Sequence, residues 1–167
     1  KTAAVRARIG GRVVHVAGIA KGSGMLSPDM ATMLSFLVTD AAVSPAFLRG
    51  CLRRVADRSF NRVTVDGETS TSDTVLLFAN GLAGNRILRS AASAEAQSFE
   101  AAVGAVAESL ARELARDGEG ATRLVTVDVT GAQSDAQAEK AARRIADSLL
   151  VKTAIFGGDA NWGRILQ

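Results

Sequence analysis

The sequence predicts a mixed α/β or α+β domain in which helices are layered on a β-sheet. Short segments of alternating apolar residues, typical of strands with one buried face, are interspersed with longer segments whose apolar residues recur at helical spacing. The 167 residues suffice for one domain with a substantial core, and no repeat or linker divides them. Apolar residues make up 47% of the chain but aromatic residues only 4%, which indicates an alanine-rich globular protein.

Strands are expected at 12–17, 33–38, 61–67 and 122–131. The second of these follows a loop of Gly, Ser and Pro at 21–31, and its apolar residues alternate from Leu34 to Val38. The last alternates in the same way between two helical segments. This interleaving of strands and helices is what favours a layered fold.

Helices are expected at 44–60, 69–84, 94–120 and 135–150. In the first, Ser44 can cap the helix and Pro45 suits its first turn. Its apolar stripe consists of Phe47, Cys51 and Val55. The second is expected because a cluster of capping hydroxyls precedes an apolar run that ends at Gly81 or Gly84.

The clearest helix is the long one at 94–120, where Arg112 and Arg116 are expected in the last turn and Gly118 ends it. Its apolar stripe consists of Phe99, Val103, Val106, Leu110 and Leu114. Ser134 can cap the final helix. The chain then closes, at 151–167, with a short apolar run and a glycine-bounded turn.

Composition excludes several classes of function. The net charge of +3 comes from 20 basic and 17 acidic residues that no stretch concentrates, so we expect no nucleic-acid partner. No apolar run approaches the roughly 20 residues of a membrane span, so no membrane partner is expected. The single Cys51 cannot form an internal disulfide, which favours a reducing, cytoplasmic compartment. The single His15 is interpreted as a strand-face residue, and without a second histidine we expect no metal site.

Thr32 is a candidate nucleophile at the junction between the 21–31 loop and the strand that follows. A threonine hydroxyl needs a base, and a cut before Thr32 would free an α-amine with a pKa of about 7.7–8.0. The same hydroxyl could make that cut by attacking the carbonyl of Ala31, a small residue that leaves room for the attack. Threonine is also common at the start of strands because of its β propensity. The residues alone therefore leave two interpretations open: Thr32 is an ordinary strand residue, or it is the nucleophile of an N-terminal-nucleophile enzyme.

Four segments of the chain carry a family resemblance. They are "KGSGMLSPDMATML" at 21–34, "SFNRVTVDGETSTSDTV" at 59–75, "DGEGATRLVTV" at 117–127 and "SLLVKTAIFGGDANWGRI" at 148–165. In this order and spacing they resemble the ornithine acetyltransferases, or glutamate N-acetyltransferases, the bifunctional protein family of arginine biosynthesis. The resemblance extends over nearly the whole chain.

The resemblance implies a layered sandwich of the N-terminal-nucleophile type and a precursor that cleaves itself between Ala31 and Thr32. Residues 1–31 would then be the C-terminal part of an α chain, and 32–167 the N-terminal part of a β chain. It further implies that Thr32 takes acetyl from N-acetylornithine as an ester, releases ornithine and passes the acetyl to glutamate. Acetyl-CoA is a further possible donor, no cofactor is implied, and the chains of one precursor are expected to form a heterotetramer.

The resemblance also implies that Lys21, Thr32 and Glu119 bind substrate. A cation suits the carboxylate of both amino-acid substrates, and an anion suits an ammonium or amide. Without the resemblance, Lys21 would be a solvated loop residue and Glu119 a polar turn residue. Five further residues lie in the segments without an assigned role: Asp66, Asp73, Asn161, Trp162 and Arg164. Of these, Asp73 is interpreted as a helix-start residue.

Some positions depart from the family pattern, and the chain lacks some of its parts. Asp29 and Ser72 replace asparagines, and Gly158 and Ala160 replace an arginine and a proline. The family's oxyanion hole belongs to an upstream segment and further substrate contacts to a C-terminal tail, so the chain is expected to be a partial middle segment. Two alternatives stay open: a related self-processing amidohydrolase or aminopeptidase, with water as acyl acceptor, and a non-catalytic interaction domain.

Overall fold

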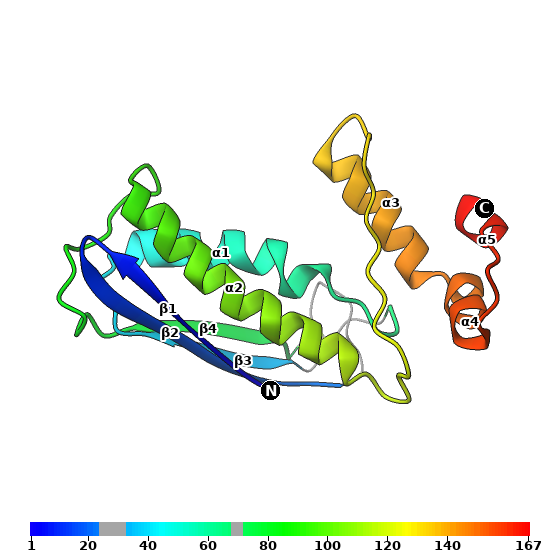
Figure 1. Ribbon diagram of the computed structural model, residues 1–167, viewed down its shortest axis with the longest axis horizontal. Helices are drawn as coiled ribbons and strands as arrows, with labels where there is room; N and C mark the ends of the chain where they lie inside the picture. Colours follow the sequence, from blue (N-terminus) through cyan, green and yellow to red (C-terminus); the bar gives the residue numbers. More distant parts are fainter. Residues whose placement is uncertain (24–32, 68–71) are drawn as a thin grey trace.

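The structure, a computed structural model, describes residues 1–23, 33–67 and 72–167. The described residues form a four-stranded sheet in the order β1-β2-β3-β4, from β1 (Thr2–Ile9), β2 (Arg12–Lys21), β3 (Leu34–Thr39) and β4 (Thr74–Ala79). The helices α1 (Pro45–Arg58) and α2 (Ala94–Arg116) cover one face of it (Figure 1). The mixed α/β layering predicted from the sequence is therefore confirmed.

The first two strands form a hairpin, and the sequence analysis missed the first of them. Ile9 pairs with Arg12 across Gly10 and Gly11, whose φ angles of 54° and 79° suit a two-residue hairpin turn. The second strand was expected to end at Ala17 but continues to Lys21. Its continuation contains alanine and glycine, which have low strand propensity, and pairing with β3 holds it extended.

The expected helix at 69–84 is wrong, because residues 74–79 form β4, parallel to β3. A short apolar run such as "TVLLFA" fits either a strand or a buried helix segment, and its pairing with β3 decides between them. The expected strand at 61–67 is wrong as well. A short 3-10 helix, η1 (Phe60–Arg62), stands at its beginning, and the remaining residues lie outside any helix or strand.

The two helices on the sheet were predicted correctly. The Ser44 hydroxyl accepts a hydrogen bond from the Phe47 N–H, at 3.4 Å, and Pro45 begins α1. Ser93 caps α2 by accepting from the Ala96 N–H at 3.1 Å. The predicted apolar stripes of both helices are buried. At the C-terminal end of α2 only Arg116 lies in the last turn, since the helix stops at that residue.

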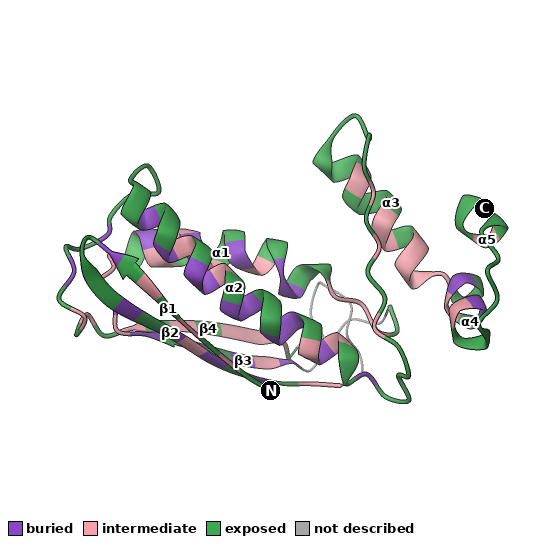
Figure 2. Cartoon of the chain, in the orientation of Figure 1, coloured by how far each residue is buried: buried purple, intermediate pink, exposed green. Residues whose placement is uncertain are grey.

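Burial follows the two layers (Figure 2). The sides of α1 and α2 that face the sheet are buried, as are alternate residues of β2 and β3. The opposite face of the sheet carries large apolar side chains that are exposed: Val13, Ile19, Phe36, Val38, Leu76 and Phe78. The sheet thus has two apolar faces, of which the helices cover one. None of the helices in the described ranges is both long and apolar enough to cross a membrane.

The described residues after α2 contain three further helices: α3 (Asp135–Asp147), α4 (Leu149–Gly157) and α5 (Gly163–Leu166). The expected helix at 135–150 ends earlier because Ser148 caps α4 instead, accepting from the Val151 N–H at 3.4 Å. The expected strand at 122–131 pairs with no strand among the described residues. Side chains tie α3 and α4 to the segment after α1: Lys152 Nζ, for example, donates to the Val65 carbonyl at 2.7 Å.

Candidate active site

One end of the sheet brings together the strand end of Lys21 and the turn of Glu119, the two described residues that are expected to bind substrate. Lys21, the last residue of β2, is paired with Leu34 at the start of β3, and Leu34 is paired with Thr74 at the start of β4. The turn after α2 reaches the same end, because the Glu119 N–H donates to the Ser23 carbonyl at 3.2 Å. Lys21 and Glu119 are far apart in the sequence, and this contact brings their segments together.

The chain just after Lys21 is held against the end of α2. Gly22 has a φ of +150°, which disfavours any side chain there, and an added Cβ would lie 3.3 Å from Leu114 Cδ2. The side-chain Nζ of Lys1 donates to the Gly22 carbonyl at 2.9 Å and forms an ion pair with Asp117 Oδ2 at 2.5 Å. Lys21 itself is exposed, so its charge faces solvent at the edge of this anchored turn.

Glu119 lies on a turn that glycine makes possible. The buried Gly118 precedes it, and a Cβ added there would lie 2.9 Å from Val65 Cγ1. Gly120 follows with a φ of +71°. Glu119 is exposed, so a cation and an anion are both accessible at this end of the sheet.

Met33 and Asp73 complete the end of the sheet. Met33 is buried, with 6% of its surface exposed, and its N–H donates to Asp73 Oδ1. Its carbonyl accepts from the Thr74 N–H at 2.9 Å. Asp73 directly precedes β4, so its interpretation as a helix-start residue is wrong. Sequence reasoning missed this contact, since it depends on how β4 pairs.

The candidate nucleophile Thr32 and its neighbour Ala31 lie outside the described residues, and so does Asp29. The described residues on either side of this segment are Ser23 and Met33, and both lie at the end of the sheet just described. The backbone carbonyl of Ser23 makes the contact to Glu119 and the backbone N–H of Met33 the contact to Asp73, so these two contacts flank residues 24–32 in the sequence.

His15 lies elsewhere on the sheet, on the face away from the helices. Its Nδ1 is 2.7 Å from Asp40 Oδ2, and its N–H donates to Asp40 Oδ1 at 2.8 Å. Burial raises the pKa of Asp40, but the hydrogen bonds from His15 outweigh it and lower that pKa below its usual value. His15 is paired across the hairpin with Arg6, away from Lys21. Its interpretation as a strand-face residue is confirmed, and the described residues contain no metal-ligand cluster.

The described residues of the fourth family segment, 148–165, do not approach Lys21. Arg164 donates to the Leu150 carbonyl at 2.8 Å and to Thr153 Oγ1 at 3.2 Å, which fastens α5 to α4. Trp162 is 72% exposed. Both helices lie away from the sheet (Figure 1). Among the described contacts, this segment has a structural role.

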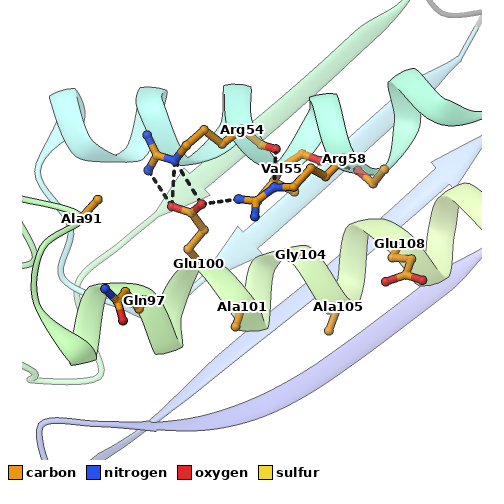
Figure 3. Close-up of a pocket in the computed structure, with 11 residues that line it drawn as sticks. Arg54, Val55, Arg58, Ala91, Gln97, Glu100, Ala101, Gly104, Ala105 and Glu108 are labelled. Carbon is orange, nitrogen blue, oxygen red and sulfur yellow. Dashed lines mark hydrogen bonds and ion pairs between the residues drawn. The ribbon is translucent and has the colours of Figure 1, made fainter. Parts of the chain in front are cut away.

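A cavity of about 500 Å³ lies between α1 and α2. Figure 3 shows Arg54 and Arg58 of α1 reaching Glu100 of α2, each with a contact of 2.5 Å. Hydrogen bonds from Arg54, and then from Arg58, lower the pKa of Glu100. Burial, with the nearby Glu100 charge, raises the pKa of the Cys51 thiol to about 12. The Glu100 carboxylate is occupied by two guanidinium groups. The Cys51 thiol is buried outside the lining of this cavity, and it is neutral, so neither group is an activated nucleophile.

The sheet with helices on one face and charged groups at one end defines a layered α/β protein with a candidate small-molecule site. The chain belongs to the ArgJ family, whose model matches residues 1–167. It is 58% identical, over 167 residues, to the arginine biosynthesis bifunctional protein ArgJ of Symbiobacterium thermophilum, with 99% of this chain and 41% of that protein covered. The protein of the same name from Gloeobacter violaceus is 53% identical over 165 residues, again covering 99% and 41%.

A solved structure supports the fold. The chain resembles the crystal structure of the arginine biosynthesis bifunctional protein ArgJ from Bacillus halodurans, with a TM-score of 0.73 and 48% identity. The match covers 76% of this chain and 59% of that one. The chain spans about two fifths of the length of the curated relatives named above.

Proposed function

We propose that this chain forms the nucleophile-bearing part of a glutamate N-acetyltransferase, which moves acetyl from N-acetylornithine to glutamate. Membership in the ArgJ family supports it, as does the association of both relatives' names with arginine biosynthesis. The structural observation that carries the proposal is the bond from the Glu119 N–H to the Ser23 carbonyl. It holds an anion beside the strand end that bears Lys21, next to the segment that contains Thr32.

The first proposed step is self-cleavage. The Thr32 hydroxyl attacks the carbonyl carbon of Ala31, and the Thr32 nitrogen leaves as a free amine, which converts the peptide bond to an ester. Water then hydrolyses the ester, releasing the Ala31 carboxylate and restoring the hydroxyl. Thr32 now carries both a nucleophile and, in its α-amine, a base of suitable pKa.

The second step is acetyl transfer through an ester. The α-amine of Thr32 accepts the hydroxyl proton as the oxygen attacks the acetyl carbonyl of N-acetylornithine. The departing amine of ornithine takes up that proton, leaving acetyl-Thr32. The amine of glutamate then attacks the ester and regenerates the hydroxyl. Acetyl-CoA could load Thr32 in the same way, as a substrate, and the scheme uses no bound cofactor or metal.

Lys21 and Glu119 are proposed to bind the amino-acid substrates. The ammonium of Lys21 pairs with a substrate carboxylate, a charge-assisted contact that both N-acetylornithine and glutamate can make. The carboxylate of Glu119 accepts from an ammonium or amide of the substrate. Their exposure at one end of the sheet supports these roles.

The two chains made by cleavage are proposed to remain together. Residues 1–31 end the α chain and 32–167 begin the β chain, so the cut leaves β2 and β3 on different chains. The pairing of β2 with β3, from Val16–Thr39 to Lys21–Leu34, and the packing of α2 on β1 and β2 join them without the severed bond. The exposed apolar sheet face supports a further layer of protein from the same precursor, within a proposed heterotetramer. The buried free thiol of Cys51 is compatible with a cytoplasmic location.

The test uses the complete protein with N-acetylornithine, with and without glutamate. We expect glutamate-dependent formation of N-acetylglutamate, and cleavage between Ala31 and Thr32 visible by mass spectrometry. Thr32→Ala should abolish both, whereas the matched control Thr130→Ala, at an exposed threonine, should change neither. Release of acetate alone would indicate the hydrolase instead. An uncleaved, inactive parent protein would indicate an interaction domain.

A further inference from the structure

We propose that Asp73 is a positioning residue whose carboxylate orients the peptide between Thr32 and Met33, and through it the nucleophile. This inference rests on the proposed function, in which Thr32 is the reacting residue. The observation behind it is the hydrogen bond from the Met33 N–H to Asp73 Oδ1. A backbone N–H bonded to a carboxylate is held about twice as strongly as one bonded to a neutral acceptor.

Met33 is restrained on three sides. Its N–H is bonded to Asp73, and its carbonyl accepts from the Thr74 N–H at 2.9 Å, so the dipeptide Asp73–Thr74, where β4 begins, holds both of its polar groups. Its side chain belongs to the buried core. A Cβ added to Gly22 would lie 3.5 Å from the Met33 Cα, so the end of β2 closes the remaining side. Met33 is therefore a fixed point beside the predicted cut.

Covalent geometry transmits this restraint to the preceding residue. The peptide bond is planar, so the directions of the Met33 N–H and N–Cα bonds together fix the plane of the peptide that joins Met33 to residue 32. After the proposed cleavage, that single peptide is the only covalent link that holds Thr32. The proposed nucleophile then depends on the Met33 peptide for its position, and Asp73 holds the N–H of this peptide. A displacement of about 1 Å at a reacting group can cost on the order of a hundredfold in rate.

The test compares Asp73→Ala, which removes the acceptor, with Asp73→Asn, which keeps an oxygen acceptor but loses the charge. Asp57→Asn is the matched control, because Asp57 is an exposed carboxylate of α1 bonded only locally, to Asn61 Nδ2 at 3.0 Å. In the complete protein, the rate of cleavage, kcat and KM are measured alongside circular dichroism. We expect Asp73→Ala to slow cleavage and lower kcat at least about tenfold at unchanged KM.

The cleavage rate and kcat of Asp73→Asn should lie between those of Asp73→Ala and those of the parent. A purely structural role does not produce this partial rescue. Should Asp73→Ala fail to fold, Asp73→Asn decides: a kcat lowered about threefold or more at unchanged KM supports the role. Parent-like kcat, or a raised KM at unchanged kcat, overturns it.

Thr32→Ala separates this inference from the proposed function. If Thr32→Ala is inactive but Asp73→Ala is fully active, the positioning role alone fails. If Thr32→Ala still cleaves and transfers acetyl, the proposed function fails, and with it the role of Asp73.

Discussion

Gly18 lies where β2 packs closely against α2, and Gly18→Ala should destabilise the protein. A Cβ added at this position would lie 2.6 Å from Leu37 Cδ2, 2.9 Å from Leu110 Cδ1 and 3.1 Å from Val106 Cγ1. All three side chains are fully buried, so none can turn out to solvent. The methyl group must push α2 away from β2 or force side chains off their rotamers. Overpacking of this kind costs about 1–3 kcal/mol, and three close contacts at once place Gly18→Ala in the upper half of that range.

The assay is urea unfolding of the complete protein, followed by circular dichroism. Gly104→Ala is the matched control, since Gly104 lies within α2 and an added Cβ there meets nothing within 4 Å. Alanine is a better helix former than glycine, so the control should raise stability by about 0.5–1 kcal/mol. Because α2 leads into the turn of Glu119, Gly18→Ala should also raise KM. An unfolding midpoint for Gly18→Ala at or above that of the parent would refute the proposed packing.

Three further predictions concern charges and the thiol. Hydrogen bonds from Arg54 hold the pKa of Glu100 below its usual 4.5, so the parent should be more stable than Glu100→Gln by about 1 kcal/mol. This advantage should be complete above roughly pH 4.5 and be lost as the pH falls below it. Equal urea unfolding midpoints of the two proteins at neutral pH would contradict this. Burial raises the pKa of Cys51 to about 12, so a thiol reagent should label it slowly in the native protein and quickly in urea, and rapid native labelling would be the contrary result. Lys21→Met and Glu119→Gln should each raise KM about tenfold or more with little effect on kcat in steady-state assays, while an unchanged KM would remove them from the substrate site.

The parts of the fold that the sequence predicted are those that local interactions determine. Ser44 and the stripe of α1 lie within one segment, and caps and helical spacing act over a few residues. β1 was missed because two of the four residues on its inward side, Ala3 and Ala7, are alanine, which gives weak alternation. β4 was assigned to a helix because its apolar run has no period of its own, and pairing with a distant strand decides its conformation. The segment at 122–131 has a strand pattern, but a strand also needs a partner.

In the candidate site, too, the local chemistry could be predicted from the sequence, whereas the spatial arrangement of the residues could not. The chemistry of Thr32 follows from threonine and amine reactivity, and the resemblance to a family supplied Lys21 and Glu119. Their approach depends on how α2 lies along the sheet, which spacing in the sequence does not reveal. The contact of Asp73 with Met33 depends on the register of β4 and so required the structure.

The most direct test of the account is to trap the acetyl group on Thr32. The complete protein is mixed with N-acetylornithine in the absence of glutamate, quenched with acid and analysed by mass spectrometry. We expect a chain that begins at Thr32 and is heavier by one acetyl group, and we expect this group to be lost when glutamate is added. An intact bond between Ala31 and Thr32, or an unmodified Thr32 in protein that still makes N-acetylglutamate, would contradict it.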